Sequence, residues 1–159
     1  MKIIAEFPFA KLDIAHVLLD LSLDDEMSKY LNLFEKCFGK RENINADTFL
    51  WFGLNHPASE NYSFGFIDKA TGNLISAYGL LPLDAMLLHK KIKCALCTNV
   101  MTDPDYSGMG LFVKIGEESI RYIASVGISM CLGIPNENAI KGHIKVGWTQ
   151  REDIWFYEK

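Results

Sequence analysis

Hydrophobic residues recur at helical spacing in two stretches of the first half of the chain. Between Asp24 and Phe38, apolar residues fall three and four positions apart behind an acidic first turn, and Gly39 follows as a stop signal. This pattern predicts an amphipathic helix. A second, shorter helix is predicted from Ala46 to Leu54, ahead of an Asn-His-Pro stretch.

The middle of the chain carries the patterns of strands. The sequences YSFGFID and NLISAYGLLPLDAMLL flank the turn KATG, which contains Gly72. They predict a hairpin whose second strand is long and interrupted by Pro82. The segment HKK then turns the chain into another strand, from Ile92 to Thr102. Three consecutive strands of this kind predict an antiparallel meander.

The second half predicts a helix, a strand and another helix. GLFVKIGEESIRYIASVG places its apolar residues on one broad face, and Gly127 ends the pattern. ISMCLGIP is nearly all apolar, which predicts a short strand that is buried on both faces and parallel to the strand before the helix. NENAIKGHIKVG predicts another helix, and DIWFYEK a last strand. The expected fold class is α+β, a mixed sheet with an antiparallel meander and one parallel strand-helix-strand crossover, which should be right-handed.

Length and composition describe an ordinary globular domain that covers residues 1–159. The chain is 49% apolar and 23% charged, and it is long enough for a single sizeable core. Its apolar runs are far shorter than the roughly 20 residues of a membrane helix, and acidic residues near the start argue against a secretory signal. The net charge of −4 has both signs scattered, with one small basic cluster, HKKIK, at a predicted turn. We therefore expect a cytoplasmic protein without a membrane or nucleic-acid partner.

The four cysteines do not predict a metal site. Cys94 and Cys97 form a CxxC pair, but they lie in a predicted strand, where a separation of three sends the side chains to opposite faces. Cys37 and Cys131 are distant in sequence. We expect four reduced, half-buried thiols in a reducing compartment.

The sequence YSGMGLF places two glycines, Gly108 and Gly110, between a predicted strand and a predicted helix. Such a turn points several backbone N–H groups at one spot, where the helix dipole adds positive potential and favours an anion. A dinucleotide fingerprint would need a third glycine at Val113, and a P-loop would need Gly-Lys-Ser/Thr, so neither motif is present. In isolation, a glycine pair of this kind is more often a tight chain reversal.

A second motif follows one strand later, and the two motifs together resemble a known family. SGMGLF is similar to the pyrophosphate turn of the Gcn5-related N-acetyltransferases (GNAT), whose usual form is Arg/Gln-x-x-Gly-x-Gly/Ala. NENAIKGHIKVGW resembles the family's later motif, roughly NxxAxxxYxxxGF, and matches it with Asn136, Ala139, His143, Gly147 and Trp148. With the preceding meander, the resemblance covers nearly the whole chain. PDYSGMGLF followed by PNENA also looks like the branch found with polysaccharide or cell-surface pathways.

The resemblance implies helices on both faces of the sheet and a site for acetyl-CoA, used as a co-substrate without a metal. Backbone N–H groups at the glycine turn would bind the pyrophosphate. This set is Ser107, Gly108, Met109, Gly110, Leu111 and Phe112. Exposed backbone of the preceding strand would bind the pantetheine arm. This second set is Asn99, Val100, Met101 and Thr102. Asn136 and Asn138 would contact the same arm, although Asn136 could also be only a helix N-cap.

The chain departs from the family pattern at four positions. Ser107 replaces Arg or Gln; it can cap the following helix, but it removes a charge-assisted contact worth about 1.5–3 kcal/mol, so modest coenzyme affinity is expected. Phe112 replaces Gly or Ala and can face the core. His143 stands where the family often has an acid tyrosine, so it is the catalytic candidate, with a purely structural histidine as the alternative. Cys94 stands at the position of a carboxylate base and is a poor replacement.

The resemblance implies an N-acetyltransferase that moves an acetyl group from acetyl-CoA to a primary amine of a small molecule by direct attack. Without a base, an amine of low basicity is favoured, such as that of an amino sugar. Two alternatives stay open: a CoA-binding or interaction module without turnover, and an acyltransferase that uses a longer acyl chain. One strand follows the second motif where the family has two. We therefore expect either a domain that is incomplete at its C-terminal end or an edge strand that is covered, as in a homodimer.

Overall fold

A computed structural model describes residues 1–53 and 62–151. These residues form a sheet with the strand order β1-β2-β3-β4-β5-β6. The strands are β1 (Lys2–Phe9), β2 (Leu12–Leu19), β3 (Tyr62–Asp68), β4 (Leu74–Leu87), β5 (Lys90–Thr102) and β6 (Met130–Gly133). All neighbouring pairs are antiparallel except β5 and β6, which are parallel. The predicted α+β fold, with a meander and one parallel crossover, is confirmed.

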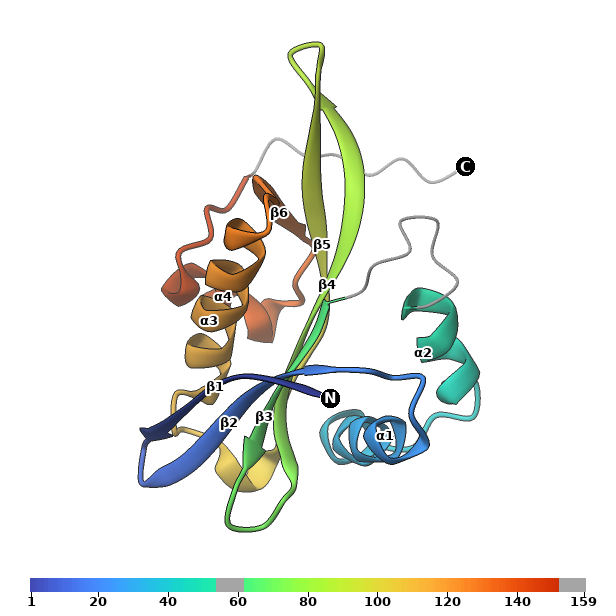
Figure 1. Cartoon of the computed structure of the whole chain (residues 1–159), viewed down its shortest axis with the longest axis vertical. Helices are drawn as coiled ribbons and strands as arrows, with labels where there is room; N and C mark the ends of the chain where they lie inside the picture. The colour runs from blue at the N-terminus through green and yellow to red at the C-terminus, as the bar shows by residue number, and fades with distance from the viewer. Residues whose placement is uncertain (54–61, 152–159) are drawn as a thin grey trace.

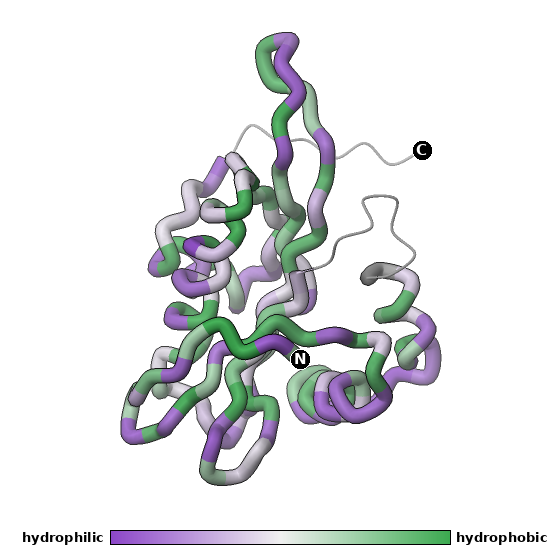
Figure 2. The backbone as a smooth tube through the Cα atoms, viewed as in Figure 1, coloured by the Kyte–Doolittle hydropathy of each residue, from purple (hydrophilic) through white to green (hydrophobic). Residues whose placement is uncertain are grey.

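Helices cover both faces of this sheet (Figure 1). They are α1 (Asp24–Phe38), α2 (Ala46–Gly53), α3 (Leu111–Ser125), α4 (Glu137–Val146) and a short 3₁₀ turn, η1 (Pro104–Tyr106). Tyr30 and Phe34 of α1 pack in a core on one face, and Ile115 and Ile123 of α3 pack in a core on the other. Figure 2 shows the apolar residues gathered along the central strands between these layers. Within the described ranges, no helix is both long enough and apolar enough to cross a membrane.

The N-terminal hairpin of β1 and β2 is the part of the fold to which the sequence patterns assigned no element. Its turn is formed by Ala10 and Lys11, which adopt φ values of 49° and 72°. Glycine, asparagine or aspartate usually occupies such left-handed positions. Because this turn contains none of them, the usual hairpin signal is missing.

Two strands differ from the prediction. β4 runs without a break through Pro82, which pairs with Ala95, so the expected interruption is wrong. β3 begins at Tyr62, which pairs with Leu80. From Leu81 onward, β4 has no described partner on its β3 side, so the missing N–H of Pro82 breaks no ladder hydrogen bond there. β6 is half-buried to exposed rather than buried on both faces, because it is the edge strand of the described sheet. The strand predicted at 153–159 lies outside the described residues.

Candidate functional site

A β-bulge in β5 marks the place where the site forms. Ala77 pairs with Met101 and Gly79 pairs with Thr98, so β5 has one residue more than β4 between these pairs. Asn99 lies in this interval with φ = 50°, a left-handed conformation that asparagine adopts more readily than most residues. A Cβ atom on Gly79 would lie 2.6 Å from the Thr98 carbonyl oxygen, so the strand opposite the bulge requires glycine.

A cleft opens beside the bulge because β5 and β6 separate there. Their pairing ends at Cys97 and Gly133, whereas β5 continues to Thr102. The cleft has a volume of ≈ 420 Å³ and is lined by α1, the loop after α1, the bulge of β5, the end of β6 and α4. It therefore combines segments from both halves of the chain.

One wall of the cleft comes from α1 and the loop that follows it. Phe34, Phe38 and Ile44 make this wall apolar. The Arg41 guanidinium carbon lies 6.0 Å from the centroid of the Phe38 ring, within the range of a cation–π contact. No aspartate or glutamate lines the cleft among the described residues, so none of them is placed there as a general base.

The glycine turn follows β5 and η1 directly. Gly108 and Gly110 adopt φ values of 77° and 79°, which glycine tolerates best. α3 begins at Leu111 with Gly110 as its N-cap and no side-chain cap, and its first helical hydrogen bond runs from the Lys114 N–H to the Gly110 carbonyl. The amides of the first helical turn thus lack helical partners, and residues 107–110 are exposed. This arrangement suits an anion.

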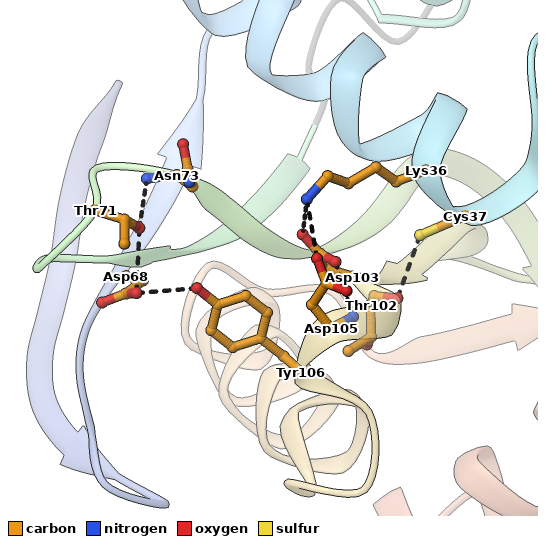
Figure 3. A network of polar contacts seen from close by, with 9 residues as sticks. All are labelled: Lys36, Cys37, Asp68, Thr71, Asn73, Thr102, Asp103, Asp105 and Tyr106. Atoms are coloured by element: carbon orange, nitrogen blue, oxygen red, sulfur yellow. Dashed lines mark hydrogen bonds and ion pairs between the residues drawn. The ribbon is translucent and has the colours of Figure 1, made fainter.

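Contacts from two sides hold the segment ahead of the glycine turn (Figure 3). On one side, Lys36 Nζ of α1 lies 2.8 Å from Oδ2 of Asp103, whose residue is 2% exposed. The hydrogen bond to Asp103 raises the pKa of Lys36, so the lysine stays charged. On the other side, the Tyr106 hydroxyl donates to Asp68 at the end of β3, at 3.1 Å. The position of the turn is therefore set by both α1 and the sheet.

His143 lies in the cleft on α4 and is 7% exposed. Its Nδ1 is 3.3 Å from the Tyr78 hydroxyl, and its ring makes edge contacts with Phe112 and Trp148. Burial lowers the pKa of His143 and raises the pKa of Tyr78, so both side chains are neutral at pH 7. When the Tyr78 O–H donates to Nδ1, the imidazole proton resides on Nε2. His143 is then a neutral hydrogen-bond donor rather than a cationic acid.

The residues predicted for the pantetheine arm divide into two groups. Asn99 and Val100 line the cleft. Met101 is 2% exposed in the core, and its carbonyl accepts a hydrogen bond from the Ser76 hydroxyl at 2.8 Å. The Thr102 carbonyl is likewise engaged, by the Cys37 thiol. The bulge is thus the part of this set that borders the cleft.

Asn136 and Asn138 are placed differently. The Asn136 side chain accepts from the Ala139 N–H at 3.0 Å as the N-cap of α4, as the alternative interpretation predicted, and Asn136 also lines the cleft. Asn138 is exposed and lies outside the lining of the cleft. Asn136 can therefore both cap the helix and border a ligand.

The side chains around the glycine turn point in different directions. Ser107 is exposed and does not cap α3, whose N-cap is Gly110, so the capping role considered for it is wrong. Met109 is exposed, and Leu111 is buried in the core. Phe112 packs against α4, where a Cβ atom on Gly142 would lie 2.5 Å from its ring. Phe112 is thus half-buried against α4 and belongs to neither of the two cores.

The cysteines near the cleft are not placed for chemistry. Cys94 is 1% exposed, and its thiol donates to the Leu83 carbonyl at 3.4 Å. Cys97 lines the cleft, but burial raises its pKa to about 12, so it remains a thiol. Among residues 1–53 and 62–151, no group of three His, Cys, Asp or Glu side chains is arranged to hold a metal ion.

Sequence reasoning did not single out Tyr78, Arg41 or the Lys36–Asp103 pair. Tyr78 and His143 are 65 residues apart in the chain, and Lys36 and Asp103 are 67 apart. Such contacts arise only when the sheet and α1 have packed, and no local motif reports them.

Comparisons with known proteins agree with this geometry. A family model described as an acetyltransferase (GNAT) domain matches residues 20–150. A Trypanosoma brucei acetyltransferase structure is similar with a TM-score of 0.70 and 15% identity, over 92% of this chain and 100% of that one. The structure of glucosamine-6-phosphate N-acetyltransferase from Arabidopsis thaliana is similar with a TM-score of 0.70 and 13% identity, over 92% of this chain and 97% of that one. A third similar structure is that of an aminoglycoside acetyltransferase from an uncultured soil metagenomic sample, in complex with sisomicin. Its TM-score is 0.72 and its identity 12%, over 92% of this chain and 95% of that one. At these identities the likeness is one of fold. No curated protein sequence matches the chain.

Proposed function

The chain belongs to the GNAT acetyltransferase family, and on that premise we propose that it transfers an acetyl group from acetyl-CoA to a primary amine of a small molecule. The observation that carries this proposal is the exposed glycine turn of Gly108 and Gly110, which follows β5, the strand whose bulge lines the cleft. Unpaired amides at a helix N-terminus suit a pyrophosphate group. When bound, acetyl-CoA supplies the acetyl group as an activated thioester.

The described residues fit this coenzyme. A Cβ atom on Gly108 would meet no atom within 4 Å, so the space in front of the turn is open. The amides of residues 108–112 would bind the pyrophosphate, with the Ser107 hydroxyl as a further donor. Asn99 and Val100 at the bulge, with Asn136 across the cleft, would contact the pantetheine arm.

The acceptor amine must reach the site uncharged, because a protonated amine has no free electron pair. No carboxylate lines the cleft among the described residues, and Cys97 remains a thiol, so the described part of the chain offers no strong base there. An amine of low basicity, such as that of an amino sugar, loses its proton to water near pH 7. The glucosamine-6-phosphate and aminoglycoside acetyltransferases of similar fold support an acceptor of this class.

We assign the catalytic role in the cleft to His143. As a neutral imidazole, it would donate its Nε2 proton as a hydrogen bond to the atom on which negative charge develops. Tyr78 keeps its own proton and orients the ring through Nδ1. In this role His143 donates a hydrogen bond and keeps its proton, whereas the acid tyrosine of the family gives its proton away.

A second candidate function is a coenzyme-binding module without turnover. It is favoured by the lack of a carboxylate among the described cleft residues and by Ser107 in place of Arg or Gln. An acyltransferase for longer chains is a third candidate, which would bind acyl-CoAs of increasing length more tightly than acetyl-CoA.

We also propose that residues 1–159 form one domain that acts in the cytoplasm and pairs as a homodimer through the C-terminal edge of the sheet.

Calorimetry with acetyl-CoA and a thiol-release assay test the proposal together. We expect binding below millimolar concentration, and thiol release with at least one member of a panel of glucosamine, glucosamine-6-phosphate, sisomicin and a lysine peptide. No binding at millimolar acetyl-CoA would refute coenzyme use altogether. Binding without thiol release across the panel would favour the module.

A further inference from the structure

The last turn of α1 contacts two parts of the molecule. Phe34 and Phe38 line the cleft, and their ring centroids are 5.0 Å apart. Lys36 and Cys37 contact instead the segment that leads into the glycine turn, where the Cys37 thiol donates to the Thr102 carbonyl at 3.2 Å (Figure 3). One helical turn thus joins the apolar wall of the cleft to the segment before the glycines.

Asp103 is the point in this segment where several elements meet. Lys36 Nζ, at 2.8 Å, and the Asp105 N–H, at 3.0 Å, donate to its carboxylate. Its own N–H donates to the Ile75 carbonyl of β4, and its carbonyl accepts from the Tyr106 N–H, both at 2.9 Å. Asp103 is therefore fixed to the sheet, to α1 and to η1 at once.

Burial makes the contact between Lys36 and Asp103 asymmetric. The Asp103 side chain is 3% exposed, whereas that of Lys36 is 51% exposed. Asp105, the second carboxylate near Lys36 at 3.5 Å, is 79% exposed. A buried carboxylate without a paired cation is strongly unfavourable, so a displacement of α1 away from the segment would leave Asp103 in that state. The two elements are therefore constrained to move together.

We propose that Lys36 and Asp103 are positioning residues that couple the apolar wall of the cleft to the glycine turn. Coenzyme held at the turn then also fixes the last turn of α1, against which the acceptor would lie. The inference rests on the proposed function, which assigns the turn to the coenzyme, and it adds that the acceptor lies against the apolar wall. Because coupling between sites is reciprocal, an acceptor that fixes α1 also tightens coenzyme binding.

Hydrogen exchange with coenzyme A as the probe tests this coupling in the full chain. In the unmodified protein, coenzyme A should slow exchange at the glycine turn and also in residues 34–39. In Lys36→Met, the protection of residues 34–39 should be lost, and coenzyme A affinity should fall by about tenfold, as expected for a charged hydrogen bond. Lys36→Arg keeps the cation and should restore both properties.

Lys29→Met is the matched control, because Lys29 is also on α1 but pairs with Asp25 of the same helix. It should bind coenzyme A with unchanged affinity and protection. If the unmodified protein binds no coenzyme A, the proposed function itself fails. If it binds, and Lys36→Met shows the same affinity and the same protection of α1, the coupling is wrong while the function stands. Should Lys36→Met not fold, Lys36→Gln, which can still donate to Asp103 without a charge, replaces it in the same comparison.

Discussion

His16 makes the folded protein sensitive to acid. Its side chain is 1% exposed in β2, and its ring lies 5.5 and 5.4 Å from the ring centroids of Phe64 and Phe66. Neither ring nitrogen has a hydrogen-bond partner in the part of the chain that the structure describes. Burial lowers the pKa of His16 from 6.5 to about 4, with a smaller opposing effect of Glu118 and a smaller reinforcing effect of Lys114. The folded protein therefore holds this histidine in its neutral form.

The size of the effect follows from the two pKa values. Between pH 6.5 and 4, the unfolded chain binds a proton at His16 that the folded chain does not, so the free energy of unfolding falls as the pH falls. One pKa unit corresponds to about 1.36 kcal/mol. The contribution of His16 is thus fully present above pH 6.5, and about 3 kcal/mol of stability is lost by pH 4.

Urea unfolding between pH 8 and pH 4 measures this loss. His16→Leu has a similar volume and cannot titrate, so its free energy of unfolding should fall about 3 kcal/mol less than that of the unmodified protein over the same range. His89→Gln is the control, because His89 is exposed in the turn between β4 and β5, and it should keep the full slope. Equal losses in the unmodified protein and His16→Leu would refute the reasoning.

Three further predictions concern the cleft. Gly108→Ala should cost about 1–2 kcal/mol of backbone strain and weaken coenzyme A binding in calorimetry; unchanged affinity would contradict the pyrophosphate assignment. Burial keeps the pKa of His143 below 6.5, so above pH 6.5 the pH dependence of kcat/KM should follow only the pKa of the amine. Below pH 6.5, protonation of His143 should make kcat/KM fall more steeply, and His143→Gln should lose this additional fall. Arg41 is the charged side chain among the described lining residues, so Arg41→Gln should raise KM about tenfold for amines that carry a carboxylate or phosphate. The KM for amines without such a group should be unaffected, and an equal change in KM for both classes of amine would exclude an anion-binding role of Arg41.

The helices were predictable because their signals are local. The apolar spacing and the flanking glycine placed α1 at residues 24–38, as observed. The hairpin of β1 and β2 was missed because the φ values of Ala10 and Lys11 are imposed by strand pairing and not by the usual turn residues. β6 was expected to be buried because its composition is apolar, but its burial depends on which neighbours cover its edge. The apolar pattern of a segment indicates which of its side chains can be buried, but it does not indicate which elements will pack against them.

The candidate site divides in the same way. Motif spacing identified Gly108, Gly110, Asn136 and His143, since each lies in a short segment whose backbone geometry its own sequence controls. The partners that set their chemistry come from elsewhere, and Tyr78 is the clearest case. When its hydroxyl donates to Nδ1, the imidazole proton of His143 resides on Nε2, and burial lowers the pKa of His143 so that the ring is neutral. The residue at the tyrosine position was thus predictable, and its protonation state was not.

The cleft depends on two irregularities that coincide in space. β5 gains one residue at Asn99, and β6 stops pairing at Gly133, so the end of β5 is left with backbone groups that no described strand covers. An asparagine in a strand indicates a bulge only weakly, whereas Gly79 on the neighbouring strand is required by the close approach of the Thr98 carbonyl. A ligand arm laid along β5 would replace the missing strand partner. The opening that weakens the sheet is therefore the same feature that would allow it to bind an extended ligand.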